Sequence, residues 1–278
     1  MDRQQLTITL RKDILKRVDE IIDGAKIRNR SHAIEYILGE QFNPRLSKAV
    51  ILAGGKDEAM QPITLEIPKA MIPVKGRPIL EHTIEWLKSA GVTEIAIVVG
   101  HLGDKIKTHF LDGNRFGVRI TYIDEGEPKG TGGALKLAKD FVGSDTFLFL
   151  YSDVLIDLDI KDFLAFHEEN GSLVTLAVTS TDDPSSYGAV RLSGPNIVEF
   201  REKPISTHNT SRLVASGVHM VEAEIFGELP RKRSFSLERE VFPKLAEDSK
   251  LRGYVFSGKW FDIGTHDEYA RALQSWGK

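Results

Sequence analysis

Hydrophobic and polar residues follow a regular alternation along the chain after residue 47. Apolar runs typical of buried strands lie at 48–53, 94–99, 119–123 and 146–151. Segments with helical spacing of apolar residues separate or follow them, at 79–90, 104–111, 133–141 and 267–276. This order predicts a doubly wound α/β sheet, which binds ligands beyond the carboxyl ends of its strands. From residue 172 the strands shorten and turn signals multiply, which indicates an antiparallel insertion.

The first 42 residues follow a different pattern. Residues 5–10 (QLTITL) alternate polar and apolar side chains, as a half-polar strand does. Residues 13–23 have helical spacing, and Ser31 is placed to cap a second helix. One short strand and two short helices cannot bury a core alone, so we expect this segment to pair with a second copy of the chain.

Length and composition fit two domains. The chain has 278 residues, 41% of them hydrophobic, so we predict a domain at 1–42, a linker at 43–47 and a larger domain at 48–278. The absence of cysteine excludes disulfides, thiolate metal ligands and cysteine catalysis. No apolar run approaches the roughly 18 residues that cross a bilayer. We therefore expect a cytoplasmic protein without a membrane segment.

The segment at 50–73 carries the first candidate chemistry. A buried strand ending at Ala53 is followed at once by Gly54 and Gly55, where main-chain N–H groups can approach a phosphate. Asp57 and Glu58 then place two carboxylates beside that position. A like-charge pair about 6 Å apart costs roughly 3 kcal/mol at an effective dielectric of about 20.

This segment resembles the signature loop of the sugar-nucleotidyltransferase family, G-G-x-G-T-R-L-x-P-L-T followed by P-K-x-x-x-P. The matching residues are Gly54, Gly55, Pro62, Thr64, Pro68, Lys69 and Pro73. The third glycine, threonine and arginine of the family fall on Asp57, Glu58 and Ala59. The resemblance implies a Rossmann-like, mixed-sheet nucleotide-diphospho-sugar transferase fold. It also implies a nucleotide site at Ala53, Gly54, Gly55 and Lys56 and a catalytic Lys69, with Lys56 as a partial substitute for the arginine's charge.

Three further motifs extend the resemblance. Gly130, Thr131 and Gly132 resemble the family's glycine-rich turn against the nucleotide base, although a helix entry without a ligand is the alternative. Asp153 follows the strand 147–151 and Asp262 lies in W-F-D-I-G-T. The resemblance implies that both aspartates bind Mg²⁺, a site that also suits phosphate oxygens.

Sugar recognition rests on weaker matches. Glu202 and Lys203 belong to an E-K-P motif, in which the family's glutamate meets sugar hydroxyls and its lysine meets the sugar phosphate. Gly188, Ser216 and Gly217 occupy other positions that the family uses for the sugar. The two glycines can equally be turn residues without ligand contact.

The amino-terminal segment resembles a ribbon-helix-helix DNA-binding domain. In that family two chains pair their strands into a ribbon that enters the major groove. The resemblance implies base contacts by Gln5, Thr7 and Thr9, and phosphate contacts by Arg28, Arg30 and Ser31 at a helix start. A dimerisation arm that never meets DNA is the alternative.

Two classes of function follow. The missing arginine favours a DNA-binding regulator whose larger domain binds a nucleotide, nucleotide sugar or sugar phosphate with weak or no turnover. The alternative is an active sugar-1-phosphate nucleotidyltransferase, dimerised or autoregulated through the amino-terminal domain. In either case we expect a homodimer or higher homo-oligomer, with the base, the sugar and any DNA sequence left open.

Overall fold

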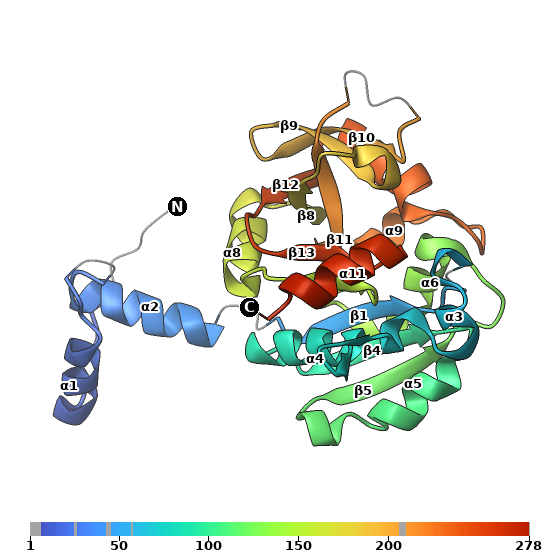
Figure 1. Cartoon of the computed structure of the whole chain (residues 1–278). Coiled ribbons are helices and arrows are strands. Elements are labelled where there is room, and N and C mark those ends of the chain that lie inside the picture. The colour runs from blue at the N-terminus through green and yellow to red at the C-terminus, as the bar shows by residue number, and fades with distance from the viewer. Residues whose placement is uncertain (1–6, 25–26, 43–45, 57, 206–209, 278) are drawn as a thin grey trace. The chain divides into compact units, whose positions relative to one another are not determined.

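The computed structural model describes residues 7–24, 27–42, 46–56, 58–205 and 210–277 (Figure 1). The chain divides into two compact units, Met1–Arg45 and Leu46–Lys278. Each unit is described here by itself. No helix in the described ranges is both long enough and apolar enough to cross a bilayer.

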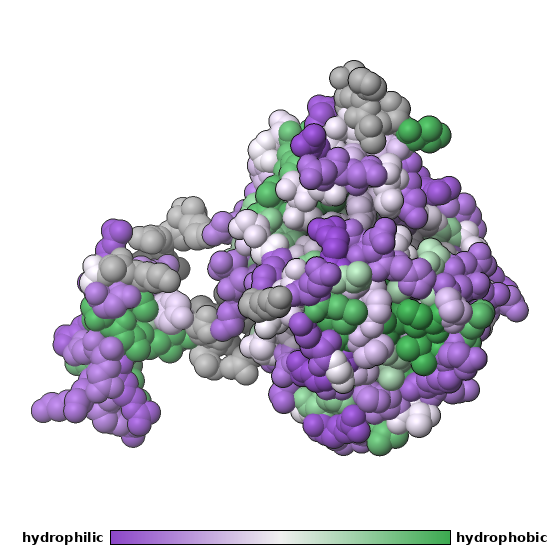
Figure 2. Space-filling model, viewed as in Figure 1, coloured by the Kyte–Doolittle hydropathy of each residue, from purple (hydrophilic) through white to green (hydrophobic). Residues whose placement is uncertain are grey.

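The amino-terminal unit contains two helices, α1 (Lys12–Glu20) and α2 (Arg30–Phe42). Val18 and Ala33 are buried in it. Its exposed large hydrophobic residues are Ile8, Tyr36, Ile37 and Leu38, and Figure 2 shows hydrophobic residues gathered on this unit. The described part of the unit therefore has little apolar core.

Two predictions for the described part of this unit differ from the structure. Residues 7–10 form no strand, Thr7 and Thr9 are exposed, and Gln5 lies outside the described residues. A ribbon strand needs a partner edge, and none of the described residues pairs with 7–10. The second helix begins at Arg30, and Asn29 Oδ1 accepts a hydrogen bond from the His32 N–H at 2.9 Å, so Asn29 takes the capping role predicted for Ser31.

The larger unit is built on one mixed sheet of nine strands in the order β5-β4-β1-β6-β11-β8-β12-β10-β9. Their bounds are β1 Lys48–Ala53, β4 Glu94–Val99, β5 Arg119–Asp124, β6 Phe147–Tyr151, β8 Val174–Ser180, β9 Gly188–Ser193, β10 Asn196–Glu202, β11 Leu213–Val221 and β12 Leu251–Val255. Four two- or three-residue strands form small separate pairs: β2 (Pro73–Val74) with β3 (Arg77–Pro78), and β7 (Val154–Ile156) with β13 (Trp260–Asp262).

The strands β5, β4, β1 and β6 are parallel, as the apolar runs predicted. The region after residue 172 is largely antiparallel, as predicted, since β9 pairs with β10 and β11 with β8. It is not an insertion, however, because β11 also pairs with β6 and continues the same sheet. Strand β12 then lies parallel to β8. Late segments of the chain thus complete the sheet beside β6, whose carboxyl end carries Asp153.

Helices cover both faces of the sheet, with separate apolar clusters beneath them. The helices are α3 Ile63–Glu66, α4 Ile79–Ser89, α5 Gly103–Phe110, α6 Gly130–Leu137, α7 Lys139–Val142, α8 Ile160–Asn170, α9 Ile225–Glu228, α10 Phe242–Glu247 and α11 His266–Ser275, and a π-helical turn spans Leu237–Val241. Thr265 caps α11 by accepting from the Glu268 N–H at 3.3 Å.

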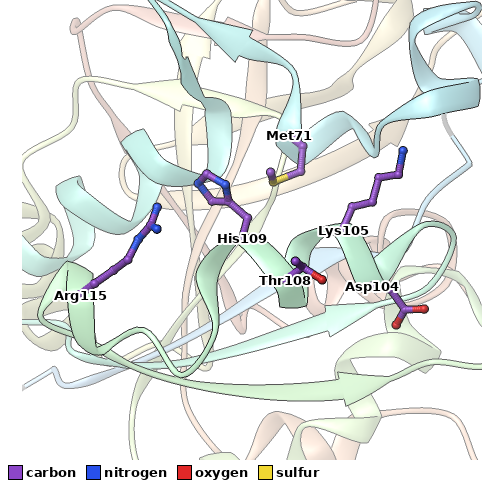
Figure 3. A pocket seen from close by; sticks show the side chains of 6 residues that line it. All are labelled: Met71, Asp104, Lys105, Thr108, His109 and Arg115. Atoms are coloured by element: carbon purple, nitrogen blue, oxygen red, sulfur yellow. The ribbon is translucent and has the colours of Figure 1, made fainter.

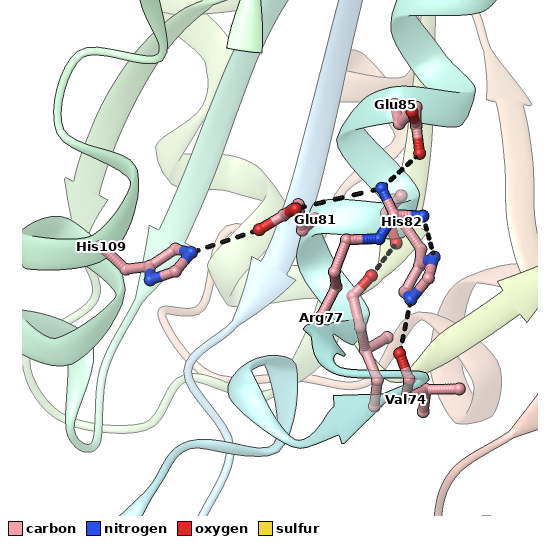
Figure 4. Close-up of polar contacts among 8 residues, drawn as sticks. Val74, Arg77, Glu81, His82, Glu85 and His109 are labelled. Atoms are coloured by element: carbon pink, nitrogen blue, oxygen red, sulfur yellow. Dashed lines mark hydrogen bonds and ion pairs between the residues drawn. The ribbon is translucent and has the colours of Figure 1, made fainter. Parts of the chain in front are cut away.

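A polar network fixes the β2–β3 hairpin against α4 (Figure 4). Arg77 donates to Glu85 Oε2 at 2.8 Å, and its second guanidinium nitrogen lies 3.3 Å from His82 Nδ1. His82 Nε2 lies 2.8 Å from the carbonyl oxygen of Val74. These contacts hold the hairpin that directly follows the Lys69 segment.

Candidate functional site

Two aspartates separated by more than a hundred residues meet at the end of β6. The short strands β7 and β13 are antiparallel, with Asp262 opposite Val154, and the Ile263 N–H donates to the Asp153 carbonyl oxygen at 2.9 Å. This pairing brings the segments carrying both carboxylates together. The structure therefore joins two residues that the motifs predicted as one site.

Lys69 supplies a cation at this junction. Its ammonium lies 2.7 Å from Asp153 Oδ2, and both side chains are mostly buried, 12% and 20% exposed. Burial and the neighbouring Asp153 carboxylate raise the pKa of Asp262 well above its ordinary value, while Lys69 opposes that shift. The junction therefore brings two carboxyl groups together with one ammonium, and a bound cation would favour the charged form of Asp262.

The residues at the junction fit Mg²⁺. Carboxylate oxygens are its preferred protein ligands, and it commonly takes one or two of them together with water and substrate phosphates. In the described ranges, no group of three or more His, Cys, Asp or Glu side chains is placed to hold a metal. Asp153 and Asp262 alone therefore suit an ion that completes its coordination on a substrate.

A cavity of 460 Å³ opens on one side of the junction. It is lined by Leu52, Gly54, Gly55, Lys56, Val98, Glu125, Pro128, Gly130, Thr131, Ala134, Tyr151, Ser152 and Asp153, and we call it the nucleotide-side cavity. A Cβ on Gly54 would lie 2.5 Å from Glu125 Oε2. A side chain at position 54 would therefore displace the Glu125 carboxylate from its place on the wall. Ala53, the remaining predicted nucleotide residue, is buried at the end of β1.

The glycine-rich turn is shaped mainly by packing. A Cβ on Gly132 would lie 2.1 Å from the Phe235 ring, and the Gly132 N–H donates to the Phe235 carbonyl oxygen at 3.0 Å. The Thr131 hydroxyl donates to Glu238 Oε2 at 2.7 Å. The Gly132 N–H and the Thr131 hydroxyl, which were predicted to contact a nucleotide, are thus hydrogen-bonded within the protein. Gly130 and Thr131 do line the cavity.

A larger cavity of 950 Å³ opens on the other side and shares Asp153 with the first. Residues lining it include Glu58, Ala59, Lys69, Asp153, Tyr187, Lys203, Trp260, Asp262, Glu268 and Arg271, and we call it the sugar-side cavity. The two signature-loop substitutions inside the described residues, Glu58 and Ala59, therefore do face this site. The third, Asp57, lies outside the described residues.

The predicted sugar residues divide into two groups. Lys203 lines the sugar-side cavity, and its N–H donates to the Tyr187 carbonyl oxygen at 2.9 Å. Glu202 pairs with Gly188 across β10 and β9, and burial raises the pKa of its carboxyl group, with Glu238 adding to the shift. Gly188 itself has a packing role, because a Cβ there would lie 2.4 Å from the Phe200 ring.

Ser216 and Gly217 lie at an irregularity in β11. The register with β8 shifts between Ala215 and His219, and Gly217 has φ +83°, which disfavours any side chain there. Ser216 is fully buried, and its carbonyl oxygen accepts a hydrogen bond from Trp260 Nε1 at 2.9 Å. This contact links Ser216 to the segment that carries Asp262.

A family model described as "Nucleotidyl transferase" matches residues 48–277. The chain belongs to this family. The match begins at the first strand of the larger unit and covers every predicted nucleotide, metal and sugar residue.

Curated relatives agree with this assignment. UTP–glucose-1-phosphate uridylyltransferase of Synechocystis sp. is 35% identical over 243 residues, covering 82% of this chain and 62% of the relative. Mannose-1-phosphate guanylyltransferase of Mycobacterium tuberculosis is 33% identical over 226 residues, covering 80% of this chain and 62% of the relative. The chain thus spans less than two thirds of the length of these relatives.

Solved structures show the same fold. HddC from Yersinia pseudotuberculosis, complexed with GMP-PN, superposes with a TM-score of 0.71 at 26% identity and covers 82% of this chain and 98% of that one. The structure of a putative glucose-1-phosphate thymidylyltransferase from Bacillus anthracis, in complex with a sucrose, superposes with a TM-score of 0.70 at 26% identity and covers 82% of this chain and 94% of that one. The predicted nucleotide-diphospho-sugar transferase fold is confirmed.

The prediction that the chain is a DNA-binding regulator is wrong. The nucleotidyltransferase relatives are named for sugar-1-phosphate substrates, which favours the alternative of an active enzyme. Nothing in the comparisons supports a ribbon-helix-helix domain, and Arg30, predicted to hold a DNA phosphate, donates to both carboxylate oxygens of Asp19 at 2.6 and 2.8 Å. Arg28 is exposed beside it.

Sequence reasoning missed two glutamates at or beside the nucleotide-side cavity, Glu125 and Glu238. Glu238 accepts hydrogen bonds from the hydroxyls of Tyr151, Thr131 and Ser236, and so ties β6 to the glycine-rich turn. Glu125 accepts from the Lys129 N–H at 2.7 Å and packs on Gly54. Neither glutamate lies in a recognisable sequence motif. Their place beside the cavity is seen only from their contacts in the folded structure.

A separate pocket of 520 Å³ lies beside Met71, two residues after Lys69 (Figure 3). Its other lining residues are Asp104, Lys105, Thr108, His109 and Arg115. None of the predicted site residues lines it. The candidate active site is therefore the pair of cavities that meet at Asp153.

Proposed function

We propose that the chain is an active sugar-1-phosphate nucleotidyltransferase, which converts a nucleoside triphosphate and a sugar 1-phosphate into a nucleotide sugar and pyrophosphate. The observation that carries the proposal is the meeting of Asp153, Asp262 and Lys69 where the nucleotide-side and sugar-side cavities join. The relatives named for this class of reaction support it. In this proposal residues 48–278 form the catalytic domain and residues 1–42 a separate appendage.

The reaction needs a phosphate oxygen of the sugar 1-phosphate to attack the α-phosphorus of the triphosphate. The bond from the α-phosphorus to the oxygen that bridges the α- and β-phosphates breaks, and pyrophosphate leaves with those electrons. Catalysis of this kind depends on positioning and on neutralising phosphate charge. A site at the junction of two cavities can hold the attacking oxygen and the α-phosphate next to each other.

The charged residues have complementary roles in this proposal. Asp153 and Asp262 would hold Mg²⁺, which neutralises phosphate charge when bound. Lys69 and Lys203 lie on the wall of the sugar-side cavity and contribute further positive charge. Lys69 also holds the Asp153 carboxylate at 2.7 Å and keeps it in place at the junction.

Product analysis tests the proposal. The purified protein is incubated with Mg²⁺, each nucleoside triphosphate in turn, and glucose 1-phosphate or mannose 1-phosphate. We expect matched release of pyrophosphate and nucleotide sugar for one or more pairs, and loss of both products in Asp153→Asn. Absence of product from the unmodified protein across this panel and a wider set of sugar 1-phosphates would contradict the proposal.

A further inference from the structure

Positive charge is scarce in the sugar-side cavity. Six of the described residues that line it are carboxylates: Glu58, Asp153, Asp182, Asp183, Asp262 and Glu268. Three are cations: Lys69, Lys203 and Arg271. Lys69 lies 2.7 Å from Asp153 Oδ2 and shares its charge with that carboxylate, so Lys203, Arg271 and the proposed metal supply the rest of the positive charge in this cavity.

Arg271 is the only arginine among the described residues that line either cavity. The family's signature arginine falls on Ala59, which lines the same sugar-side cavity. A guanidinium offers planar, bidentate hydrogen bonding to phosphate that an ammonium cannot reproduce. Arg271 is therefore the one side chain at this site with that chemistry.

The helix that carries Arg271 is fixed to the catalytic segments. Helix α11 follows the Asp262 strand closely and packs beside it (Figure 1). Its first residue, His266, has Nε2 3.0 Å from the Gln61 carbonyl oxygen, and the Tyr269 hydroxyl donates to the Pro73 carbonyl oxygen at 2.7 Å. Both contacts attach α11 to the signature-loop region.

Within α11, Glu268 orients the arginine. Arg271 Nη1 donates to Glu268 Oε1 at 2.5 Å, and the Arg271 side chain is 68% exposed while that of Glu268 is 24% exposed. The charges of both residues act on the Tyr187 hydroxyl: burial and Asp262 raise the Tyr187 pKa, Glu268 adds to the rise, and Arg271 opposes it. Arg271 thus lies on the side of the junction where Tyr187 and Lys203 line the wall.

We propose that Arg271 is a substrate-binding residue that contacts the phosphate of the sugar 1-phosphate, and that Glu268 is its positioning residue. The inference rests on the proposed nucleotidyltransferase activity. Under this proposal the phosphate-binding guanidinium comes from α11, the helix that follows Asp262. The signature loop itself has alanine at position 59. No arginine is among the described residues that line the nucleotide-side cavity, so we expect the effect on the sugar phosphate to exceed that on the nucleotide.

Steady-state kinetics with Arg271→Ala and Arg271→Lys tests the inference. One lost charge-assisted contact raises the KM for the sugar 1-phosphate by roughly 10- to 100-fold in Arg271→Ala. We expect a smaller rise in Arg271→Lys, which keeps the charge, and in Glu268→Gln, which loosens the orientation. The KM for the nucleoside triphosphate stays within about threefold of the unmodified value, a difference of roughly 0.6 kcal/mol.

Gln274→Ala is the matched control, because Gln274 is exposed on the same helix and lines neither cavity. It should leave both KM values unchanged. An unchanged sugar 1-phosphate KM in Arg271→Ala, or an equal rise in both KM values, overturns the inference while leaving the activity intact.

Calorimetric measurement of sugar 1-phosphate binding tests the role of Arg271 independently of catalytic activity. If the unmodified protein releases no pyrophosphate, the proposed function fails, and binding of glucose 1-phosphate and mannose 1-phosphate with Mg²⁺ is measured instead. Weaker binding in Arg271→Ala supports the phosphate contact. Equal binding by both proteins, or no binding by either, overturns it.

Discussion

The two cavities that meet at Asp153 are built in different ways. The nucleotide-side cavity is lined by glycines, apolar side chains and few charges, whereas nine charged side chains line the sugar-side cavity. In the first, close backbone packing shapes part of the wall, because a Cβ on Gly130 would lie 2.6 Å from the Phe235 carbonyl oxygen. In the second, side chains from late segments of the chain define it.

In our proposal, this difference is the reason that the signature loop can carry Ala59 where the family has arginine. Residues whose Cβ would clash cannot change without moving their neighbours, so the backbone-built side is constrained by packing. A charge on an open wall can be supplied from another element, because phosphate binding depends on where the charge lies and not on which segment carries it. Arg271 on α11 is such a source in our inference.

The largest expected effect concerns the junction. Asp262→Asn removes one of two carboxylates proposed to hold Mg²⁺, and loss of such electrostatic stabilisation lowers kcat by about a thousandfold. Pyrophosphate release under saturating substrates measures it. Asp267→Asn, an exposed neighbour on α11, is the control and should retain full activity. Activity of Asp262→Asn within tenfold of the unmodified protein would remove Asp262 from the mechanism.

A second prediction concerns a buried histidine that packs against Tyr151, a residue that lines the nucleotide-side cavity. His219 is buried against the rings of Phe149, Tyr151 and Phe242, and neither ring nitrogen has a hydrogen-bond partner among the described residues. Burial lowers the pKa of His219 from 6.5 to about 4. Because the unfolded state then binds the proton more tightly, the free energy of unfolding falls as the pH drops from 6.5 toward 4, by about 3 kcal/mol from this group.

His219→Phe should remove that part of the pH dependence. Urea unfolding of both proteins between pH 4 and 7 measures it, and the difference between them cancels the contribution of shared carboxylates. His101→Phe, at an exposed position, should behave like the unmodified protein. Parallel stability curves for His219→Phe and the unmodified protein would show that His219 does not titrate in this window.

A third prediction tests the tight packing of the glycine-rich turn. Gly132→Ala places a Cβ 2.1 Å from the Phe235 ring, and such overpacking costs about 2 kcal/mol of unfolding free energy. We expect a raised KM for the nucleoside triphosphate as the turn shifts. Gly227→Ala is the control, since a Cβ there meets nothing within 4 Å. A fully stable Gly132→Ala protein would mean that the segment around Phe235 moves freely.

The smallest expected effect restores the family residue. Ala59→Arg adds a guanidinium to the wall of the sugar-side cavity, and we expect kcat/KM to rise by up to about tenfold, or 1.4 kcal/mol. Ala59→Gln controls for side-chain size. The rise should be larger in the Arg271→Ala background if the two guanidinium groups serve neighbouring phosphates. Lower activity in Ala59→Arg would indicate that the wall has adapted to a small residue.

Much of the larger unit could be predicted because its signals are local. The apolar runs placed β1 and β4 with the bounds observed, and the motifs around Asp153 and Asp262 identified both carboxylates. Predictions for the amino-terminal unit were less successful. A short strand depends on a partner edge that the sequence of one chain does not specify, and Asn29 competes with Ser31 for the same helix start.

The functional error came from weighting one residue above the rest of the site. The missing arginine at Ala59 suggested weak turnover, whereas the family relatives point to an active enzyme. A single charge on an exposed wall contributes a few kcal/mol at most. A charge on another helix or strand can compensate for that amount. The sequence of the motif alone does not show which other helix or strand lies close enough to do so.

By itself the sequence determined the strand and helix order, the family motifs and the residue types needed for a magnesium and phosphate site. Periodicity and short motifs are local properties of the sequence, so they can be recognised without knowledge of the fold. Only the tertiary structure decided that Thr131 donates to Glu238, that Gly132 packs on Phe235, and that Arg271 shares a cavity with Ala59. These relations join segments far apart along the chain, and their distances depend on how the whole sheet and its helices pack.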